Sequence, residues 1–138
     1  MTNDLIRTCA ALVLAAGVTL VAGCVDKSNP DIIDKRSVER WNYLIAHEAE
    51  KAYDYLTPGY RATQTREAYA TAMNNRPVIW KSAEFQGKSC DGDRCDVQVT
   101  VTYSMPVPGK SERRTDVTSR QSETWLRLDG QWYYLPND

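Results

Sequence analysis

The side chains that could act as general acids or bases are one histidine and three glutamates. His47 is the single histidine and Glu48 follows it, while Glu84 and Glu123 stand in segments with the alternating pattern of β-strands. A carboxyl group whose pKa is raised inside a pocket can serve as a general base. Because no second histidine completes a ligand set, we interpret His47 as a surface residue rather than a catalyst or metal ligand.

Two of the four cysteines enclose a short turn. Cys90 and Cys95 are separated by Asp-Gly-Asp-Arg, and the segments on either side have the pattern of strands. A redox pair usually has two residues between its cysteines, at the start of a helix. In an exported chain such a pair forms a disulfide. We therefore predict a structural disulfide, which fixes a turn and stabilises by about 2 kcal/mol.

Three aspartates surround the same turn. Asp91, Asp93 and Asp96 offer oxygen ligands, as the start of a calcium loop does. The twelfth position of such a loop is Thr102, however, and Gly92 does not stand where the loop needs its glycine. We interpret the segment as a solvated turn and expect neither a metal nor a cofactor.

The N-terminal segment has the layout of a secretory signal. Arg7 precedes an uncharged run from Thr8 to Gly23, rich in alanine, leucine and valine. With 16 residues the run is shorter than the roughly 20 that a bilayer-spanning helix needs. A cleaved signal peptide over residues 1–23 is therefore favoured over an uncleaved anchor helix or a buried helix.

The end of this run resembles a bacterial lipobox. Residues 20–24 read Leu-Val-Ala-Gly-Cys, and the resemblance implies that Cys24 becomes the first residue of the mature chain. It would carry a diacylglyceryl thioether and an acylated amino group, with palmitate as a typical acyl chain. Two or more acyl chains hold a protein stably on a membrane. Val25, where an aspartate would retain a lipoprotein in the inner membrane, favours the outer membrane facing the periplasm.

The composition describes one ordinary globular domain. The 138 residues are 42% hydrophobic, and 17 basic and 18 acidic side chains give a net charge of -1. The composition excludes a strongly disordered chain, and the nearly balanced charge argues against binding to nucleic acid. Four tryptophans, eight tyrosines and one phenylalanine all follow Cys24. We expect a tether over residues 24–30 and a domain over 31–138.

Two helices are predicted in the first half of this domain. Asn29 and Pro30 resemble a helix start, and apolar residues then recur at spacings of three and four until Leu56, before Pro58. This pattern predicts one long amphipathic helix with the following inward residues: Ile33, Val38, Trp41, Ile45, Ala49, Ala52 and Leu56. Its other side would carry Arg40, His47, Lys51 and Asp54. A second helix is predicted over residues 65–73, with Thr65 as its cap.

The second half has the period of β-strands. Strands are predicted over residues 78–88, 97–105, 116–128 and 131–135, and Val97, Val99 and Val101 give the clearest alternation. Asp129 and Gly130 form a strong hairpin turn. Helices followed by antiparallel strands indicate an α+β fold.

The last hairpin can be registered from its turn. Pairing Leu128 with Gln131 places Leu126 opposite Tyr133 on one face. On the other face Arg127 meets Trp132, and Trp125 meets Tyr134. Both faces carry large side chains, so one covers the helices and the other is either a second core layer or an exposed surface. We take Trp125, Trp132 and Tyr134 as a candidate partner or pocket surface.

Several segments resemble the nuclear transport factor 2 superfamily. The similarity lies in Arg-Trp at residues 40–41, Leu-Ile at 44–45, Ala-Tyr-Asp-Tyr-Leu-Thr-Pro-Gly-Tyr-Arg at 52–61, and Trp-Leu-Arg-Leu-Asp-Gly-Gln-Trp-Tyr at 125–133. It implies a cystatin-like cone, in which N-terminal helices pack on a curved antiparallel sheet. These are packing motifs, so the resemblance implies a fold more than a task.

The superfamily includes isomerases, dehydratases and many non-catalytic binding modules. Its enzymes place an acidic residue or a histidine inside the cone, whereas the inward strand positions here are mostly valine, tyrosine, tryptophan and leucine. No catalytic residue can be carried over, and we expect a non-enzymatic module that binds an envelope protein or a small apolar ligand, an inhibitor or immunity protein included. The alternative is an isomerase or dehydratase that uses Glu48, Glu84 or Glu123. The oligomeric state stays open.

Overall fold

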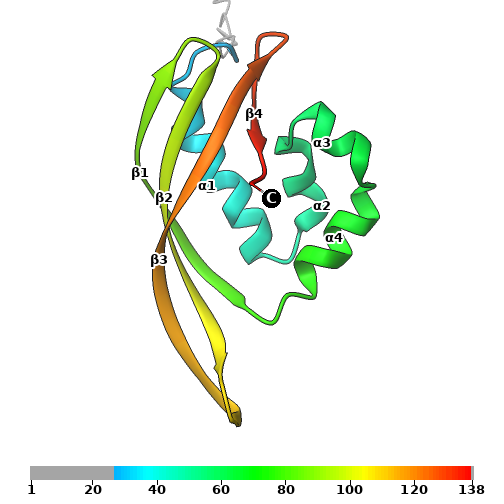
Figure 1. Ribbon diagram of the computed structural model, residues 1–138, viewed down its shortest axis with the longest axis vertical. Helices are drawn as coiled ribbons and strands as arrows, with labels where there is room; N and C mark the ends of the chain where they lie inside the picture. Colours follow the sequence, from blue (N-terminus) through cyan, green and yellow to red (C-terminus); the bar gives the residue numbers. More distant parts are fainter. Residues whose placement is uncertain (1–26, 138) are drawn as a thin grey trace, which may run out of the picture.

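The computed structural model describes residues 27–137 and has the expected α+β architecture (Figure 1). The elements are α1 Ile32–Ile45, α2 Ala49–Ala52, the 3-10 helix η1 Tyr53–Tyr55, α3 Pro58–Thr63, α4 Arg66–Asn74, β1 Ile79–Asp91, β2 Arg94–Val107, β3 Lys110–Leu128 and β4 Gln131–Leu135. The predicted signal peptide and Cys24 lie outside the described residues. In the part that is described, no helix is long and apolar enough to cross a membrane.

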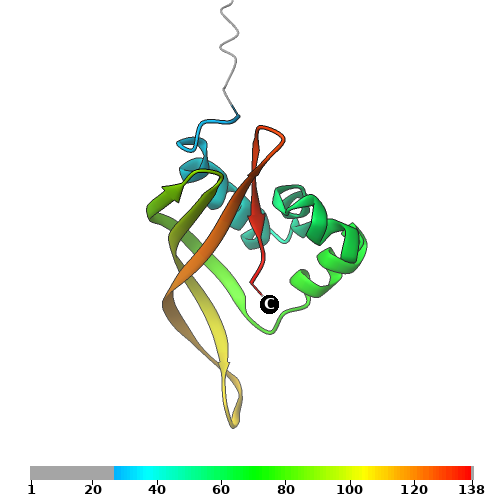
Figure 2. The ribbon, with the colours of Figure 1, turned by 45° about the horizontal axis from the view of Figure 1, so that its top comes forward.

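The four strands form one antiparallel sheet in the order β1-β2-β3-β4. The sheet is strongly curved, and the helices lie on one side of it, while the β2–β3 hairpin reaches well beyond them (Figures 1 and 2). The alternation predicted for the second strand is confirmed, because Val97, Val99 and Val101 are all buried. α1 packs against β1 and this inner face, so that Ile33 joins the same buried cluster.

The predicted register of the last hairpin is confirmed at every pair. Leu128 lies opposite Gln131, Leu126 opposite Tyr133 and Trp125 opposite Tyr134. The turn residues Asp129 and Gly130 have φ values of 50° and 73°, as a type I′ turn requires. This register turns Trp125 and Trp132 toward the helices, where they are 0% and 1% exposed. These two side chains belong to the core and cannot offer an exposed partner surface.

The prediction of one long helix up to Leu56 is wrong. α1 ends at Ile45, and His47 adopts a φ of 58°, a left-handed conformation that a continuing helix does not allow. The Glu48 N–H donates to the Tyr43 carbonyl at 2.8 Å, which closes the end of α1 before α2 begins. The apolar periodicity continues across this break because Ala49 and Ala52 join a second buried cluster with Leu44. Periodicity alone therefore did not reveal the turn.

A helix that the sequence did not predict begins at Pro58. The Thr57 hydroxyl accepts a hydrogen bond from the Tyr60 N–H at 3.4 Å, and Pro58 occupies the first helical position. Proline was interpreted only as the end of the preceding helix, but here it also starts the next one. The cap of the following helix is confirmed, since the Thr65 hydroxyl accepts from the Ala68 N–H at 3.2 Å.

The predicted disulfide between Cys90 and Cys95 is confirmed. The two residues lie directly opposite each other at the end of the β1–β2 hairpin. Cys95 is fully buried in the core, whereas Cys90 is exposed. The bond therefore joins the outermost strand of the sheet to a core residue.

Candidate functional site

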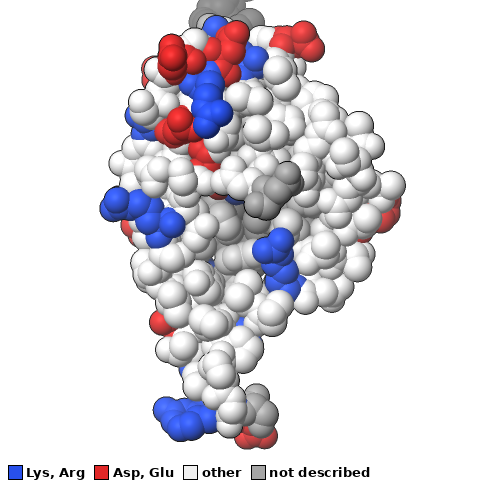
Figure 3. All heavy atoms as spheres, in the orientation of Figure 1, with Lys and Arg blue, Asp and Glu red and all other residues white. Residues whose placement is uncertain are grey.

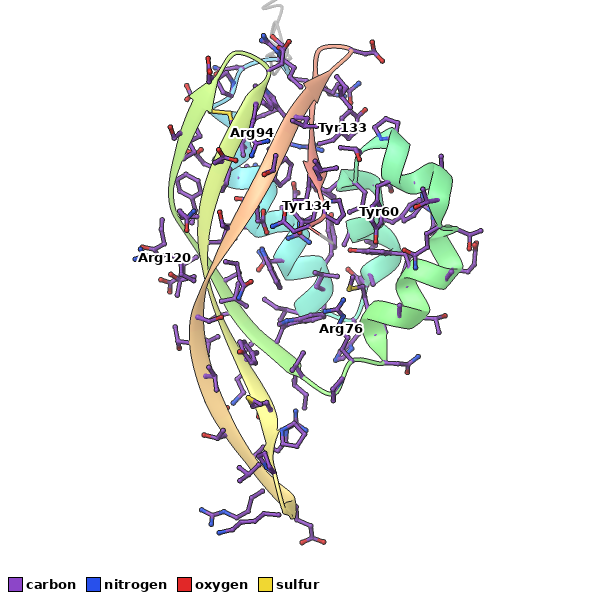
Figure 4. The ribbon with its side chains drawn as sticks, viewed as in Figure 1. Tyr60, Arg76, Arg94, Arg120, Tyr133 and Tyr134 are labelled. Atoms are coloured by element: carbon purple, nitrogen blue, oxygen red, sulfur yellow. A yellow bond between two sulfur atoms is a disulfide. The ribbon has the colours of Figure 1, made fainter. Side chains whose placement is uncertain are left out.

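A cavity of about 300 Å³ lies between the helices and the inner face of the sheet. Its walls come from α1, α3, α4, β1, β3, β4 and the residues that follow α4 and β4. Tyr60 and Tyr134 face each other across this region in Figure 4. On the face seen in Figure 3, most charged side chains lie at the two ends of the molecule, basic groups also lie midway between them, and the part formed by α2 to α4 is mostly uncharged.

A buried ion pair forms the floor of the cavity. Arg40 of α1 contacts Glu123 of β3, and their side chains are only 4% and 2% exposed. The same carboxylate accepts the Trp41 indole N–H at 2.6 Å on Oε1 and the Trp125 indole N–H at 2.9 Å on Oε2. Both oxygens of Glu123 are thus occupied by N–H donors from three residues.

The predicted outward position of Arg40 is wrong. Arg40 lies in the stripe of α1 that also buries Ile33, Ser37 and Leu44, because a charge from β3 compensates it there. Burial is the largest single effect and lowers the pKa of Arg40, but Glu123, Tyr134 and Tyr69 together outweigh it, so the pKa lies above its ordinary value.

The Arg40 guanidinium is also held by aromatic rings. Its Cζ lies 4.0 Å from the ring centroid of Tyr134 and 4.9 Å from that of Trp41. Its Nε is buried and has no hydrogen-bond acceptor among the described residues. Arg40 therefore has one buried N–H donor that no described protein group satisfies.

Two tyrosines line the cavity next to this pair. Burial raises the pKa of both Tyr69 and Tyr134, although the nearby Arg40 charge acts in the opposite direction. Both hydroxyls therefore stay protonated at neutral pH. They add neutral hydrogen-bonding groups to a cavity whose other walls include Leu44, Met73 and Trp80.

A second cavity of about 220 Å³ adjoins the first. Both are lined by Trp41, Arg76, Trp80 and Gln121, and the second extends along the sheet past Val101 and Tyr103. The Trp41 and Trp80 rings meet edge to face at 5.8 Å between centroids. The two cavities thus share a wall, and the second, which runs along the sheet, is the more apolar of the two.

Arg76 stands where the two cavities meet. It follows α4 in the connection to β1, it is exposed, and Figure 4 shows it at the end of the helical layer next to the sheet. Within residues 27–137 its side chain makes no ion pair and no hydrogen bond. Its positive charge is therefore available to whatever occupies the cavity.

Of the predicted acid–base residues, only Glu123 lies in the cavity. Glu48 is half-exposed and pairs with Lys51 at 2.8 Å, and Glu84 is exposed on β1. His47 is exposed in the turn after α1, which confirms its interpretation as a surface residue. The structure does not bring these four residues together.

The other residues singled out in the sequence make ion pairs or pack in the core. Asp93, in the turn after β1, pairs with Arg127 at 2.6 Å, and Asp96 of β2 pairs with Arg94 at 2.9 Å. Of the three aromatic residues proposed as a partner or pocket surface, Tyr134 lines the cavity, while Trp125 lies behind Glu123 in the core.

Sequence reasoning missed the two arginines of the cavity. Arg40 could have been found, because it is seven residues after Ile33 and four before Leu44, on one helical face. Arg76 stands in an irregular segment without periodicity, so the sequence carries no signal for its position. Tyr60 and Tyr69 were likewise recognised only as packing residues.

Comparison with known proteins identifies the fold. No family model and no curated protein matches the chain. Among solved structures, a SEC-C motif containing protein from Rhodopseudomonas palustris has 11% identity and a TM-score of 0.60, and the match covers 83% of this chain and 80% of that one.

Two further structures agree on the architecture. A nuclear transport factor 2-like protein with a cystatin-like fold from Novosphingobium aromaticivorans has 13% identity and a TM-score of 0.50 over 75% of both chains. The calcium/calmodulin-dependent kinase II hub homology domain from Chlamydomonas reinhardtii has 15% identity and a TM-score of 0.50, over 76% of this chain and 92% of that domain. At such identities the likeness concerns the fold alone, and it shows that this chain has the cystatin-like fold of nuclear transport factor 2-like proteins.

Proposed function

We propose that the protein is a lipid-anchored envelope lipoprotein whose domain binds a small molecule in the cavity between helices and sheet. The observation that carries the binding proposal is the pair of adjoining cavities, with their aromatic walls and the unpaired Arg76 side chain. Ligand sites in proteins are typically clefts of this size, with aromatic walls and a few convergent polar groups. The lipid anchor rests on the sequence of residues 20–24 alone.

A small ligand is favoured over an envelope protein as the partner of this domain. The aromatic side chains that could have formed a partner surface, Trp125 and Trp132, are buried. Ile79 and Leu128 are the exposed large apolar side chains of the described surface, and the buried Trp125 and Trp132 add nothing to that surface. The two cavities are thus the candidate recognition site in the described part of the molecule.

The non-enzymatic role is supported by the surroundings of Glu123. An isomerase or dehydratase would need a carboxylate in the cavity that can accept a proton from the substrate. Glu123 is the carboxylate of the cavity lining, and its oxygens accept N–H groups from Arg40, Trp41 and Trp125. Such a carboxylate holds the helices to the sheet rather than acting on a substrate.

Co-purification with a ligand tests the binding proposal. The full chain is isolated from its own envelope, extracted with organic solvent, and the extract is analysed by mass spectrometry. Gln121→Trp fills the cavity from the inner face of β3, and Gln98→Trp makes the same change on β2, away from both cavities.

We expect a stoichiometric small molecule with the wild-type chain and with Gln98→Trp, but not with Gln121→Trp. Retention of the same molecule by Gln121→Trp would show that binding occurs elsewhere. Conversion of the molecule by the wild-type chain, lost in a folded Glu123→Gln variant, would favour the isomerase or dehydratase alternative.

A further inference from the structure

The charges that line the two cavities are unequal. Arg40, Arg76 and Glu123 are the charged residues of the lining, so the space carries one formal positive charge more than negative. Glu123 does not present its charge to the cavity, because its oxygens already accept three N–H groups. A ligand in this space therefore meets a positive potential.

Two arginines of the lining indicate which kind of ligand group would match this potential. Arg76 is free of acidic partners within the described chain and lines both cavities. Arg40 adds a second guanidinium to the lining of the first cavity, although its Nε–H is buried and is not exposed to the cavity. An oxyanion suits such donors best, since hydrogen bonds between ionised partners are the strongest kind.

The other requirement concerns the body of the ligand. The second cavity runs along Trp80, Val101 and Tyr103, which present aromatic and aliphatic surface. A small inorganic anion would leave this surface uncovered. The shape and lining thus fit a molecule with one charged end and one apolar end.

We propose that the ligand of this cavity is an organic monoanion, a carboxylate on an aromatic or aliphatic body, whose charge is recognised by Arg76. This inference rests on the proposed function and specifies its ligand class. The apolar body lies along the tryptophan-lined part of the space, and the carboxylate lies toward the arginines.

Three probes with the same body separate charge from shape. The full chain, purified in a non-ionic detergent, is titrated by calorimetry with 3-phenylpropionate, 3-phenylpropionamide and 3-phenylpropylamine. We expect the carboxylate to bind about tenfold more tightly than the amide, and the amine more weakly than either, because only the carboxylate forms a charge-assisted hydrogen bond.

Variants of Arg76 then locate the charge recognition. Arg76→Gln should lower the affinity for the carboxylate by about tenfold and leave that for the amide unchanged. Arg76→Lys should restore part of the difference. Arg120→Gln is the matched control, since Arg120 is exposed on the outer side of the sheet, away from both cavities (Figure 4).

Equal affinities for the carboxylate and the amide, or an Arg76→Gln variant that binds the carboxylate normally, would overturn the proposal. So would the absence of carboxylate binding. The co-purification experiment is independent of these probes, so a neutral molecule found there would refute the anion and leave the binding function intact. A chain that binds neither probes nor any extracted molecule would refute both.

Discussion

Arg40 and Glu123 are separated by 83 positions in the sequence, yet they form the ion pair that joins α1 to β3 beneath the cavity. Removing one partner of a buried pair leaves an uncompensated charge in a medium that solvates it poorly. The pair therefore helps to hold α1 against the sheet.

Glu123→Gln is expected to destabilise the protein by about 3 kcal/mol, because it leaves the buried Arg40 charge without its counter-ion. Urea unfolding followed by circular dichroism measures the loss. Glu48→Gln is the control: it removes the half-exposed partner of Lys51 and should change stability by less than about 0.5 kcal/mol. Equal effects of the two variants would contradict the importance assigned to burial.

The buried tyrosines predict how stability responds to high pH. The pKa values of Tyr69 and Tyr134 are raised above the ordinary 10.0 by burial, so both groups ionise more easily in the unfolded chain. Their contribution to stability is complete below pH 10.0 and decreases as the pH rises through the folded-state values. The ultraviolet absorbance of tyrosinate should therefore rise at higher pH in the native protein than in the urea-unfolded protein. Tyr69→Phe should make this difference between the two titrations smaller.

The disulfide should contribute modestly to stability. Cys90 and Cys95 close a short loop, so the chain-entropy model gives about 2 kcal/mol. The double variant Cys90→Ala/Cys95→Ala, compared with wild type in urea, measures this value. The two-residue change should leave the circular dichroism spectrum intact, and a spectrum without sheet signal would mean that the bond is required for folding.

Two glycines allow a matched test of the last hairpin. Gly130 has a φ of 73°, where a Cβ is strained, whereas Gly59 in α3 has open space and no such conformation. Gly130→Ala is expected to cost about 1 kcal/mol, and Gly59→Ala to be neutral or to stabilise by about 0.5 kcal/mol. Thermal unfolding of both variants measures these changes in stability. A Gly130→Ala variant as stable as wild type would be inconsistent with the type I′ turn.

The anchor proposed for Cys24 can be tested in cells. Cys24→Ser removes the thiol that lipid modification requires, so the protein should appear in the soluble fraction instead of the membrane fraction. Cys9→Ser, within the predicted signal peptide, is the control and should stay membrane-bound. A Cys24→Ser variant that remains in the membrane would rule out the lipobox.

The sheet was more predictable from the sequence than the helices, for a physical reason. Side chains alternate with a period of two along a strand, and a two-residue turn fixes the pairing, so Asp129 and Gly130 determined the whole register of β3 with β4. The helix prediction depended on apolar periodicity alone. The predicted helix continued past His47 because Leu44 before the break and Ala49 and Ala52 after it are all buried at helical spacing, and periodicity does not show the break.

The cavity was the least predictable part. Sequence patterns place charged residues on the surface by default, and Arg40 is buried because Glu123 of β3 compensates its charge. Glu123 was recognised as a carboxylate of the cone, but its three donors come from α1 and from β3, so its role depends on tertiary packing. Arg76 stands in a connection whose position follows from the packing of α4 and β1.

The contact between the start of the domain and its last hairpin gives the molecule a direction. The Trp132 indole N–H donates to the Ser28 carbonyl at 2.9 Å, which holds the beginning of the described chain at the end of the sheet near the β3–β4 turn, opposite the tip of the β2–β3 hairpin (Figure 1). Cys24 is four positions before Ser28, a span of at most about 14 Å. With an anchor at Cys24, one end of the molecule would be membrane-proximal, and the hairpin tip would be the part that reaches furthest from the bilayer.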